Sequence, residues 1–298
     1  MMKPFRKTSR WRVLLQVGWA MAIVHGLWFL WFLLEKIKEE DFIVQNLGTK
    51  IVLGLLLLFI ISVLYFFILK KIQGLHKSMR FAGNFIVVLY LFSMLWLAWC
   101  TVFNPPITIT HIMNAKYSLK RNYVSSSNLG VNIKLAAIAA EDQLFPDHDG
   151  FDLKAIKKAI KYNQRNPKKQ RGASTISQQT AKNIFLWQGG GFLRKGLEVF
   201  YTFTIEKLWS KEKILTRYLN IAEMGPGIFG ADAAARAYYN KPSKDLTYAE
   251  AASIAAAFPN PKIFTVRPAS RFVVNRSPII QRQMAALSHD ADVMEIVK

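Results

Sequence analysis

With 298 residues, the chain is long enough for one ordinary domain and a substantial appendage, and 52% of its residues are hydrophobic, including eight Trp and 21 Phe. Its single cysteine, Cys100, excludes a disulfide within the chain and a thiolate metal site. The formal net charge of +21 indicates a negatively charged partner, but charge alone does not distinguish lipid headgroups and phosphate ligands from nucleic acid.

Three apolar runs lie in the first third of the chain, at residues 13–34, 51–69 and 81–103. Each is close to the ~20 residues that a membrane-spanning helix needs. The first run is longer than the apolar part of a signal peptide, lacks a small-x-small cleavage site and is followed by two further runs. We therefore predict a membrane region over residues 1–103 that contains three transmembrane helices.

Lys and Arg gather before the first run and between the second and third runs, whereas the first loop mixes basic and acidic residues. Short loops rich in Lys and Arg stay in the cytoplasm, which predicts a cytoplasmic N-terminus. Three crossings then place everything after about residue 104 outside. This outer part is itself basic, with 28 Lys and Arg against 15 Asp and Glu.

The segment after the third run begins with Asn104, Pro105 and Pro106, which end the apolar helix. Residues 104–130 are predicted as a linker, in which Ile107–Ile112 is a short extended exit. Residues 131–290 show helical patterning without a run of alternating strands, so a mainly α domain is expected. The expected helices are 132–141, 153–165, 175–185, 193–209, 211–222, 230–239 and 248–257.

Several of these helices begin at residues that cap a helix N-terminus. Asp152, Ser174 and Ser210 each precede an expected helix, and a hydroxyl or carboxylate oxygen there accepts a hydrogen bond from the first free backbone N–H groups. Thr247, with Glu250 three residues later, has the spacing of a capping box.

The first motif with chemical content follows an Ala-rich helix and contains Glu141, Asp142, Phe145 and His148. Two adjacent carboxylates at a helix C-terminus repel each other and face the negative end of the helix dipole, and both effects raise a carboxyl pKa. A carboxylate with a raised pKa is a better general base near neutral pH. An isolated Glu-Asp pair is more often a solvated acidic turn, and a lone His is more often structural.

The second motif is Arg171–Asn183, in which Ser174, Gln178 and Lys182 are four residues apart and Gln179 is adjacent. On a helix these side chains form one polar stripe that starts at an N-terminus, which favours anions. Such a stripe is usually only solvated.

The third motif is Arg194, Lys195 and Glu198, one helical turn apart. By its spacing alone, this motif is an ordinary surface salt bridge.

Together, and in this order, the three motifs resemble those of the family-51 glycosyltransferases, in particular the monofunctional peptidoglycan glycosyltransferases of bacteria. The resemblance runs from about Val131 to Met284. Ala251–Pro259 resembles the family's fifth motif. Residues that resemble the fourth motif are Lys213, Ile214, Leu215, Tyr218, Leu219 and Asn220.

The resemblance implies a lysozyme-like α-helical domain that polymerises lipid II, with inversion at the anomeric carbon, onto a growing chain carried by undecaprenyl diphosphate. It implies that Glu141 is the general base and that Glu198 is a second catalytic glutamate with a less settled role. It also implies that Lys182, Arg194 and Lys195 surround the diphosphate. The polar wall of the substrate site is implied to be Ser174, Thr175, Gln178 and Gln179, with Asp142, Phe145 and His148 shaping the first motif.

The implied location is the bacterial cytoplasmic (inner) membrane, with the catalytic domain on the periplasmic side. The implied partners are lipid II, the lipid-linked glycan chain, membrane lipids and other proteins of cell-wall synthesis or division, and nucleic acid is not among them. No dedicated metal site is expected because the histidines are scattered, although assistance by a divalent cation such as Mg²⁺ or Mn²⁺ stays open. The three predicted spans depart from the single span usual in monofunctional members.

Three rival interpretations are weighed against synthesis. A bifunctional penicillin-binding protein needs a transpeptidase domain, and no Lys-Thr-Gly follows the Ser-x-x-Lys at Ser210. A glycan-cleaving enzyme of similar fold has no need of the three cations at a leaving diphosphate. A non-catalytic basic membrane scaffold predicts that Glu141→Gln leaves function intact.

Overall fold

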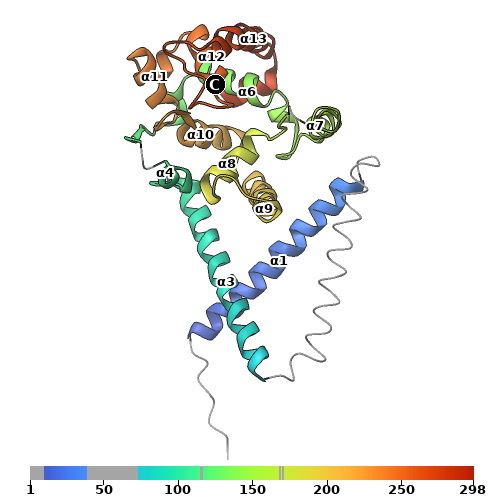
Figure 1. The fold of residues 1–298 in the computed structure, drawn as a ribbon. Helices are drawn as coiled ribbons and strands as arrows, with labels where there is room; N and C mark the ends of the chain where they lie inside the picture. The colour runs from blue at the N-terminus through green and yellow to red at the C-terminus, as the bar shows by residue number, and fades with distance from the viewer. Residues whose placement is uncertain (1–9, 39–72, 115–116, 168, 170) are drawn as a thin grey trace, which may run out of the picture. The chain divides into compact units, whose positions relative to one another are not determined.

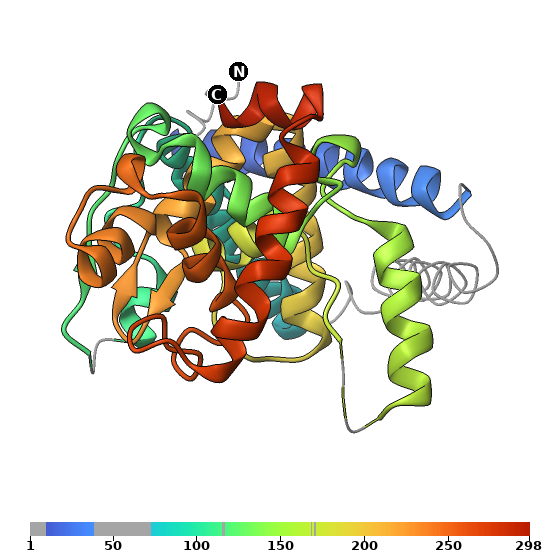
Figure 2. The same cartoon turned by 90° about the horizontal axis from the view of Figure 1, so that it is seen from above.

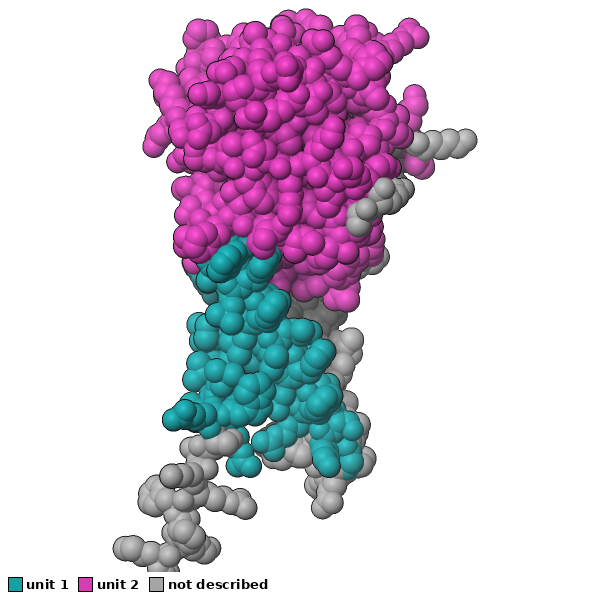
Figure 3. Space-filling view, turned by 90° about the vertical axis from the view of Figure 1, so that its left-hand side faces the viewer, with its two compact units in different colours: residues 1–100 teal, residues 101–298 magenta. Residues whose placement is uncertain are grey.

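The computed structural model describes residues 10–38, 73–114, 117–167, 169 and 171–298. The chain divides into two compact units, Met1–Cys100 and Thr101–Lys298 (Figure 3). The first unit contains the long apolar runs of the sequence, apart from the last residues of the third run, and the second unit contains every residue that the sequence assigns to the site.

Two helices of the first unit are long and apolar enough to cross a membrane, α1 (Arg10–Lys38) and α3 (Gln73–Val102) (Figure 1). They confirm that the first and third apolar runs are helical. The second predicted span, residues 51–69, lies outside the described residues.

The second unit is mainly helical, as predicted, and each of the seven expected helices is present with ends within one residue of those expected. Two short 3₁₀ helices, η2 (Phe145–Asp147) and η3 (Ser243–Asp245), join them. The α-helices are α4 (Ile109–Met113), α5 (Ser126–Leu129), α6 (Val131–Glu141), α7 (Leu153–Arg165), α8 (Ile176–Phe185), α9 (Phe192–Leu208), α10 (Lys211–Ile221), α11 (Ala231–Tyr239), α12 (Tyr248–Ala256), α13 (Arg271–Leu287) and α14 (Ala291–Val297).

The centre of this unit is α6, which packs against α12 and α13. Ile133, Leu135 and Ile138 on α6 are at most 2% exposed, and full burial of each such side chain stabilises the fold by roughly 1.5–3 kcal/mol. The small alanines between them allow close packing on the remaining sides. Because α6 is buried along most of its length, the residue at its C-terminal end is held on a rigid element.

A second packing layer is formed by α8, which lies between α9 and α10. By contrast, α7 has no fully buried residue and stands at the rim of the unit (Figure 2). Its register is set by the Asp152 carboxylate, which accepts a hydrogen bond from the Ala155 N–H at 2.8 Å and confirms the predicted cap.

A small sheet has the strand order β1-β3-β2, with β1 (Lys120–Arg121) parallel to β3 (Ile228–Phe229) and β2 (Glu223–Gly225) antiparallel to it. Strands of two or three residues are too short to show alternation, so the sequence gives no sign of them.

Two local predictions are wrong. Ile107–Ile112 is not an extended exit, because the Thr108 side chain accepts from the His111 N–H and starts α4 at Ile109. The cap of α8 is Thr175 and not Ser174, because only Thr175 has a Gln three residues later to complete a capping box.

The C-terminal helices α13 and α14 were not expected from the sequence. Pro278 lies inside α13, where proline normally ends a helix. Burial of Val273, Ile280 and Met284 against the rest of the unit outweighs that local penalty.

Candidate active site

Glu141 is the last residue of α6, and its side chain is 14% exposed. It lines a groove of about 640 Å³ together with Ser174, Gln179, Arg171 and Arg276. The groove lies between the C-terminal end of α6, the start of α7, the segment before α8, and α13. The carboxylate of Glu141 is therefore presented to a cleft from the end of a largely buried helix.

Burial raises the pKa of Glu141 above its ordinary value. A hydrogen bond from Gln179 and the charges of Arg276 and Lys182 act in the opposite direction, while Asp142 adds to the increase. The upward shift predicted from the sequence is confirmed, but burial is its largest cause and the neighbouring carboxylate contributes less.

Gln179 holds the Glu141 carboxylate through a hydrogen bond of 2.7 Å from its Nε2 to Oε2. The amide oxygen of Gln179 accepts a longer hydrogen bond of 3.5 Å from the Tyr218 hydroxyl. Burial raises the pKa of Tyr218 well above its usual value, so this hydroxyl stays protonated and can donate to the amide oxygen. Both contacts fit one orientation of the Gln179 amide, with its nitrogen toward the glutamate.

Lys182 lies one turn after Gln179 on α8 and interacts electrostatically with both glutamates, Glu141 and Glu198. Burial lowers the pKa of Lys182, and the charges of Arg194 and Lys195 lower it further, while the two carboxylates raise it. The two acidic groups are thus linked through one partly buried ammonium group.

Glu198 lies on α9, and its side chain is 3% exposed. Arg194 donates to its Oε2 at 2.6 Å, and Lys195 forms an ion pair with Oε1. The spacing alone suggested a surface salt bridge, but burial of the carboxylate makes this an almost desolvated cluster, where charge pairing is stronger than in water. Lys195 remains 45% exposed, so the cluster has one accessible cation.

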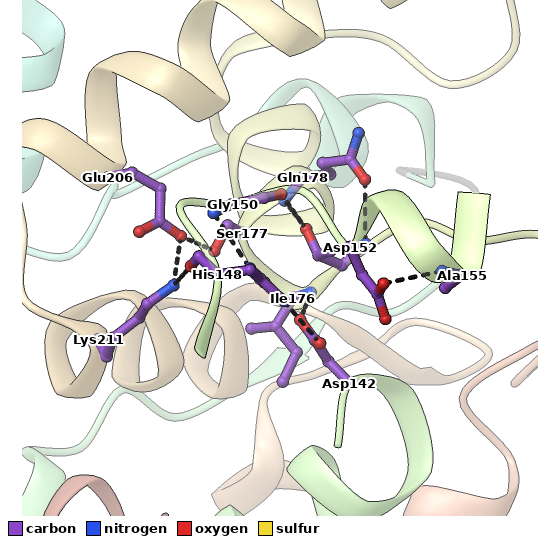
Figure 4. A network of polar contacts seen from close by, with 11 residues as sticks. Asp142, His148, Gly150, Asp152, Ala155, Ile176, Ser177, Gln178, Glu206 and Lys211 are labelled. Atoms are coloured by element: carbon purple, nitrogen blue, oxygen red, sulfur yellow. Dashed lines mark hydrogen bonds and ion pairs between the residues drawn. The ribbon is translucent and has the colours of Figure 1, made fainter. Parts of the chain in front are cut away.

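Asp142, the residue after Glu141, also lines the groove, and its buried carboxylate is bonded into the network around the loop that precedes α7 (Figure 4). Its carboxylate accepts from the Ile176 N–H at 3.0 Å and from His148 Nε2 at 2.9 Å. The Gly150 N–H donates to His148 Nδ1 at 3.1 Å, which leaves Nε2 to donate to the carboxylate of Asp142. Asp142 and His148 therefore join the end of α6 to the start of α8.

The same loop is closed from its other side by α9 and α10 (Figure 4). Lys211 donates to the His148 carbonyl at 2.5 Å and to the Glu206 carboxylate at 2.9 Å. The Ser177 hydroxyl donates to the same Glu206 oxygen, and Thr175 donates to the Gly150 carbonyl at 2.6 Å. Side chains from the end of α6 and from α8, α9 and α10 thus form one buried hydrogen-bond network around this loop.

The predicted polar stripe on α8 is wrong in part. Ser174 precedes the helix and lines the groove, but the side chain of Gln178 is buried and accepts from the Thr175 N–H in the capping box. Phe145 is fully buried against the same loop. Of the predicted polar wall, Ser174, Thr175 and Gln179 line the groove, and Gln178 does not.

Two groove residues were missed by the sequence analysis, Arg276 and Arg171. Arg276 donates to the Ala140 carbonyl at 3.0 Å and lies 3.9 Å from Glu141 Oε1. It belongs to α13, which was not expected. The guanidinium of Arg171 stacks on Tyr162, and Asn163 bonds the Arg171 backbone, so α7 holds it at the groove.

Among the described residues, no group of three or more His, Cys, Asp or Glu side chains is arranged to hold a metal ion.

Comparison with known proteins points to one family. A family model described as Transglycosylase matches residues 108–285. The biosynthetic peptidoglycan transglycosylase of Pectobacterium carotovorum is 51% identical over 175 residues, which cover 59% of this chain and 72% of the relative. That of Mannheimia succiniciproducens is 52% identical over 181 residues, covering 60% and 74%, and that of Escherichia coli is 52% identical over 174 residues, covering 58% and 72%.

Proposed function

The chain belongs to the transglycosylase family, and from that premise we propose that it is a peptidoglycan glycosyltransferase that polymerises lipid II into β-1,4-linked glycan strands. Its relatives are named biosynthetic peptidoglycan transglycosylases. The observation that carries the proposal is the position of Glu141, which ends a buried helix, lines a groove and shares Lys182 with a second buried glutamate.

In the proposed reaction, Glu141 accepts the proton of the acceptor sugar's 4-hydroxyl as that oxygen attacks the anomeric carbon of the donor. The new C–O bond forms while the bond to the diphosphate breaks, and the diphosphate leaves with the bonding electrons. Attack from the face opposite the leaving group inverts the anomeric carbon. The raised pKa of Glu141 brings its basicity closer to that useful at neutral pH.

The cations of the second and third motifs are proposed to stabilise the leaving diphosphate. Negative charge builds on that group in the transition state, and fixed cations in a poorly hydrated site stabilise it more than water does. Lys182 interacts electrostatically with both glutamates, and Lys195 is the accessible member of the Glu198 cluster. Glu198 is proposed to keep Arg194 and Lys195 in place and so to act through them.

The membrane location is part of the same proposal. Two described helices are long and apolar enough to span a bilayer, which is compatible with membrane association. A lipid-linked substrate requires an active site near the bilayer, and the basic loops predict a cytoplasmic N-terminus. We propose a multi-pass protein of the cytoplasmic membrane with its catalytic domain on the outer side.

A lipid II polymerisation assay with the full-length protein tests the function. Glu141→Gln should lower the rate by about 10²–10⁴-fold, the range contributed by a positioned general base. The matched control is Glu295→Gln, which removes an exposed carboxylate from α14 and should leave the rate unchanged.

Two results would contradict the proposal. One is a Glu141→Gln variant that polymerises at the wild-type rate, as a non-catalytic scaffold predicts. The other is release of soluble fragments from finished sacculi without any polymer from lipid II, as a glycan-cleaving enzyme predicts.

A further inference from the structure

Within the first unit, a cavity of about 390 Å³ lies between the N-terminal parts of α1 and α3. Its polar lining includes the two guanidinium groups of Arg12 and Arg80 and the amides of Gln16 and Asn84. Its apolar lining is formed by Leu15, Trp19 and Met79. The proposed active site uses none of these residues.

The cavity has a fixed shape because the two helices approach each other closely beside it. A Cβ atom added at Gly18 would lie 2.7 Å from Val87, and one added at Gly83 would lie 3.0 Å from Trp19. The Trp19 indole N–H also donates to Asn84 Oδ1 at 3.2 Å across the helix pair. Small residues at a membrane helix crossing permit this approach, and the helices then diverge around the cavity (Figure 1).

The position of the two arginines along the helices is informative. Arg12 and Arg80 lie two and three residues after Arg10 and Lys77, where the candidate spans begin. At a rise of about 1.5 Å per residue, both lie within roughly 5 Å of the same end of the two spans. Trp19 is about 10 Å deeper than Arg12 on the same basis. The cavity is thus cationic at its interfacial end, and further in it is lined by Leu15 and Trp19 together with the amides of Gln16 and Asn84.

Neither guanidinium has a carboxylate partner among the described residues. Two unpaired cations that line one cavity repel each other, and an anion between them relieves that repulsion. Guanidinium groups bind phosphate oxygens through two parallel, charge-assisted hydrogen bonds.

We propose that this cavity binds the phosphate headgroup of an anionic phospholipid from the cytoplasmic leaflet. Basic pockets between transmembrane helices on the cytoplasmic side recognise anionic headgroups, and that leaflet supplies them. Beyond the arginines, Leu15 and Trp19 offer apolar contacts to the part of a lipid next to its headgroup, which a small hydrated anion lacks. The inference rests on the proposed orientation of the chain, but it is independent of the proposed catalytic residues.

The test uses the full-length protein in detergent, with retained lipid counted by native mass spectrometry. The probes are phosphatidylglycerol and phosphatidylcholine with identical acyl chains. The wild-type protein should retain phosphatidylglycerol in preference, and the variant Arg12→Gln/Arg80→Gln should bind it at least about tenfold more weakly. A tenfold change corresponds to about 1.4 kcal/mol, within the range of one charged hydrogen bond.

The matched control is Arg10→Gln/Lys77→Gln, which removes the same charge from the same ends of the two helices but not from the cavity lining. It should retain the lipid. Leu15→Trp, which fills the cavity and keeps both arginines, should lose it. Lipid II polymerisation should persist in all these variants, which separates this site from the proposed function.

Three outcomes would overturn the inference. One is retention of phosphatidylglycerol by Arg12→Gln/Arg80→Gln at the wild-type level. Another is an equal loss of lipid in Arg10→Gln/Lys77→Gln, which would indicate bulk charge attraction. Displacement of the lipid by millimolar inorganic phosphate would indicate a free-anion site.

Discussion

The side chain of Glu141 meets two opposing requirements, because it must be charged to accept a proton and yet it is almost buried. Burial favours the neutral carboxyl, while Gln179, Arg276 and Lys182 favour the carboxylate. The pKa that results is raised, so the proposed general base is kept basic at some cost in the stability of the folded protein.

This balance predicts how Glu141→Gln affects unfolding. A raised folded-state pKa means that the group's contribution to stability is complete at low pH and is lost as pH rises through that pKa. The uncharged amide of Gln has no such pH-dependent loss of stability. At pH 7 the thermal midpoint of Glu141→Gln should therefore stay unchanged or rise by a few degrees, while activity is lost. Differential scanning calorimetry at pH 4 and pH 7 measures the effect. The expectation would be contradicted if Glu141→Gln had a lower thermal midpoint than wild type at pH 7 and the same midpoint at pH 4.

Arg276 is expected to tune the same carboxylate. Its charge lowers the pKa of Glu141, and its hydrogen bond to the Ala140 carbonyl fixes its distance. Arg276→Gln should therefore move the acidic limb of the kcat/KM profile to higher pH, and Arg276→Lys should restore part of the difference. Arg282→Gln, an exposed change on the same helix, is the control. An acidic limb that does not move in Arg276→Gln would show that the guanidinium has no positioning role.

At the scale of elements, the site depends on the angle at which α8 begins. The capping box of Thr175 and Gln178 sets that start, and the Thr175 hydroxyl also donates to the Gly150 carbonyl of the loop that contains His148. Asp142 binds the next N–H of the helix. Three side chains from two segments therefore decide where Gln179 and Lys182 lie.

Thr175→Ala should reduce stability by about 1–2 kcal/mol, the range for loss of a helix cap, and should also lower polymerisation. Thr247→Ala is a matched control, because it removes the capping box of α12, which supplies no predicted site residue. The control should lose about 1 kcal/mol in urea unfolding and retain its rate. If Thr175→Ala and Thr247→Ala had equal stability and equal polymerisation rates, the N-terminal cap of α8 would have no role in positioning the site.

At the scale of the whole molecule, the proposed topology places the N-terminal end of α3 in the cytoplasm and the C-terminal end of the catalytic domain outside the membrane. Because Cys100 is the only cysteine, Cys100→Ala gives a background without thiols for testing this. Gly74 and His289 are both exposed positions for a single introduced cysteine.

In spheroplasts, a membrane-impermeant maleimide should label His289→Cys, which lies outside in the proposed topology. It should label Gly74→Cys only after detergent permeabilisation. The reverse pattern would contradict the orientation inferred from the basic loops.

The local chemistry of the sequence was sufficient to predict most helices of the catalytic unit. Helical periodicity and capping residues act over a few positions, so α6, α7 and α10 have the predicted ends within one residue. The sequence also indicated Glu141, because the order of the polar residues in its motif can be recognised without knowledge of the fold.

Contacts between distant segments decided the rest. Burial against α6 makes α13 a helix in spite of Pro278, and that helix brings Arg276 to Glu141. Burial also takes Gln178 out of the polar stripe that its spacing suggested and into the capping box of α8. The formation of the helices and the place of the acidic motif depend on neighbours along the chain, so both can be read from the amino-acid sequence. Which charges meet depends on burial and on the distances between side chains, and these follow from how the helices pack.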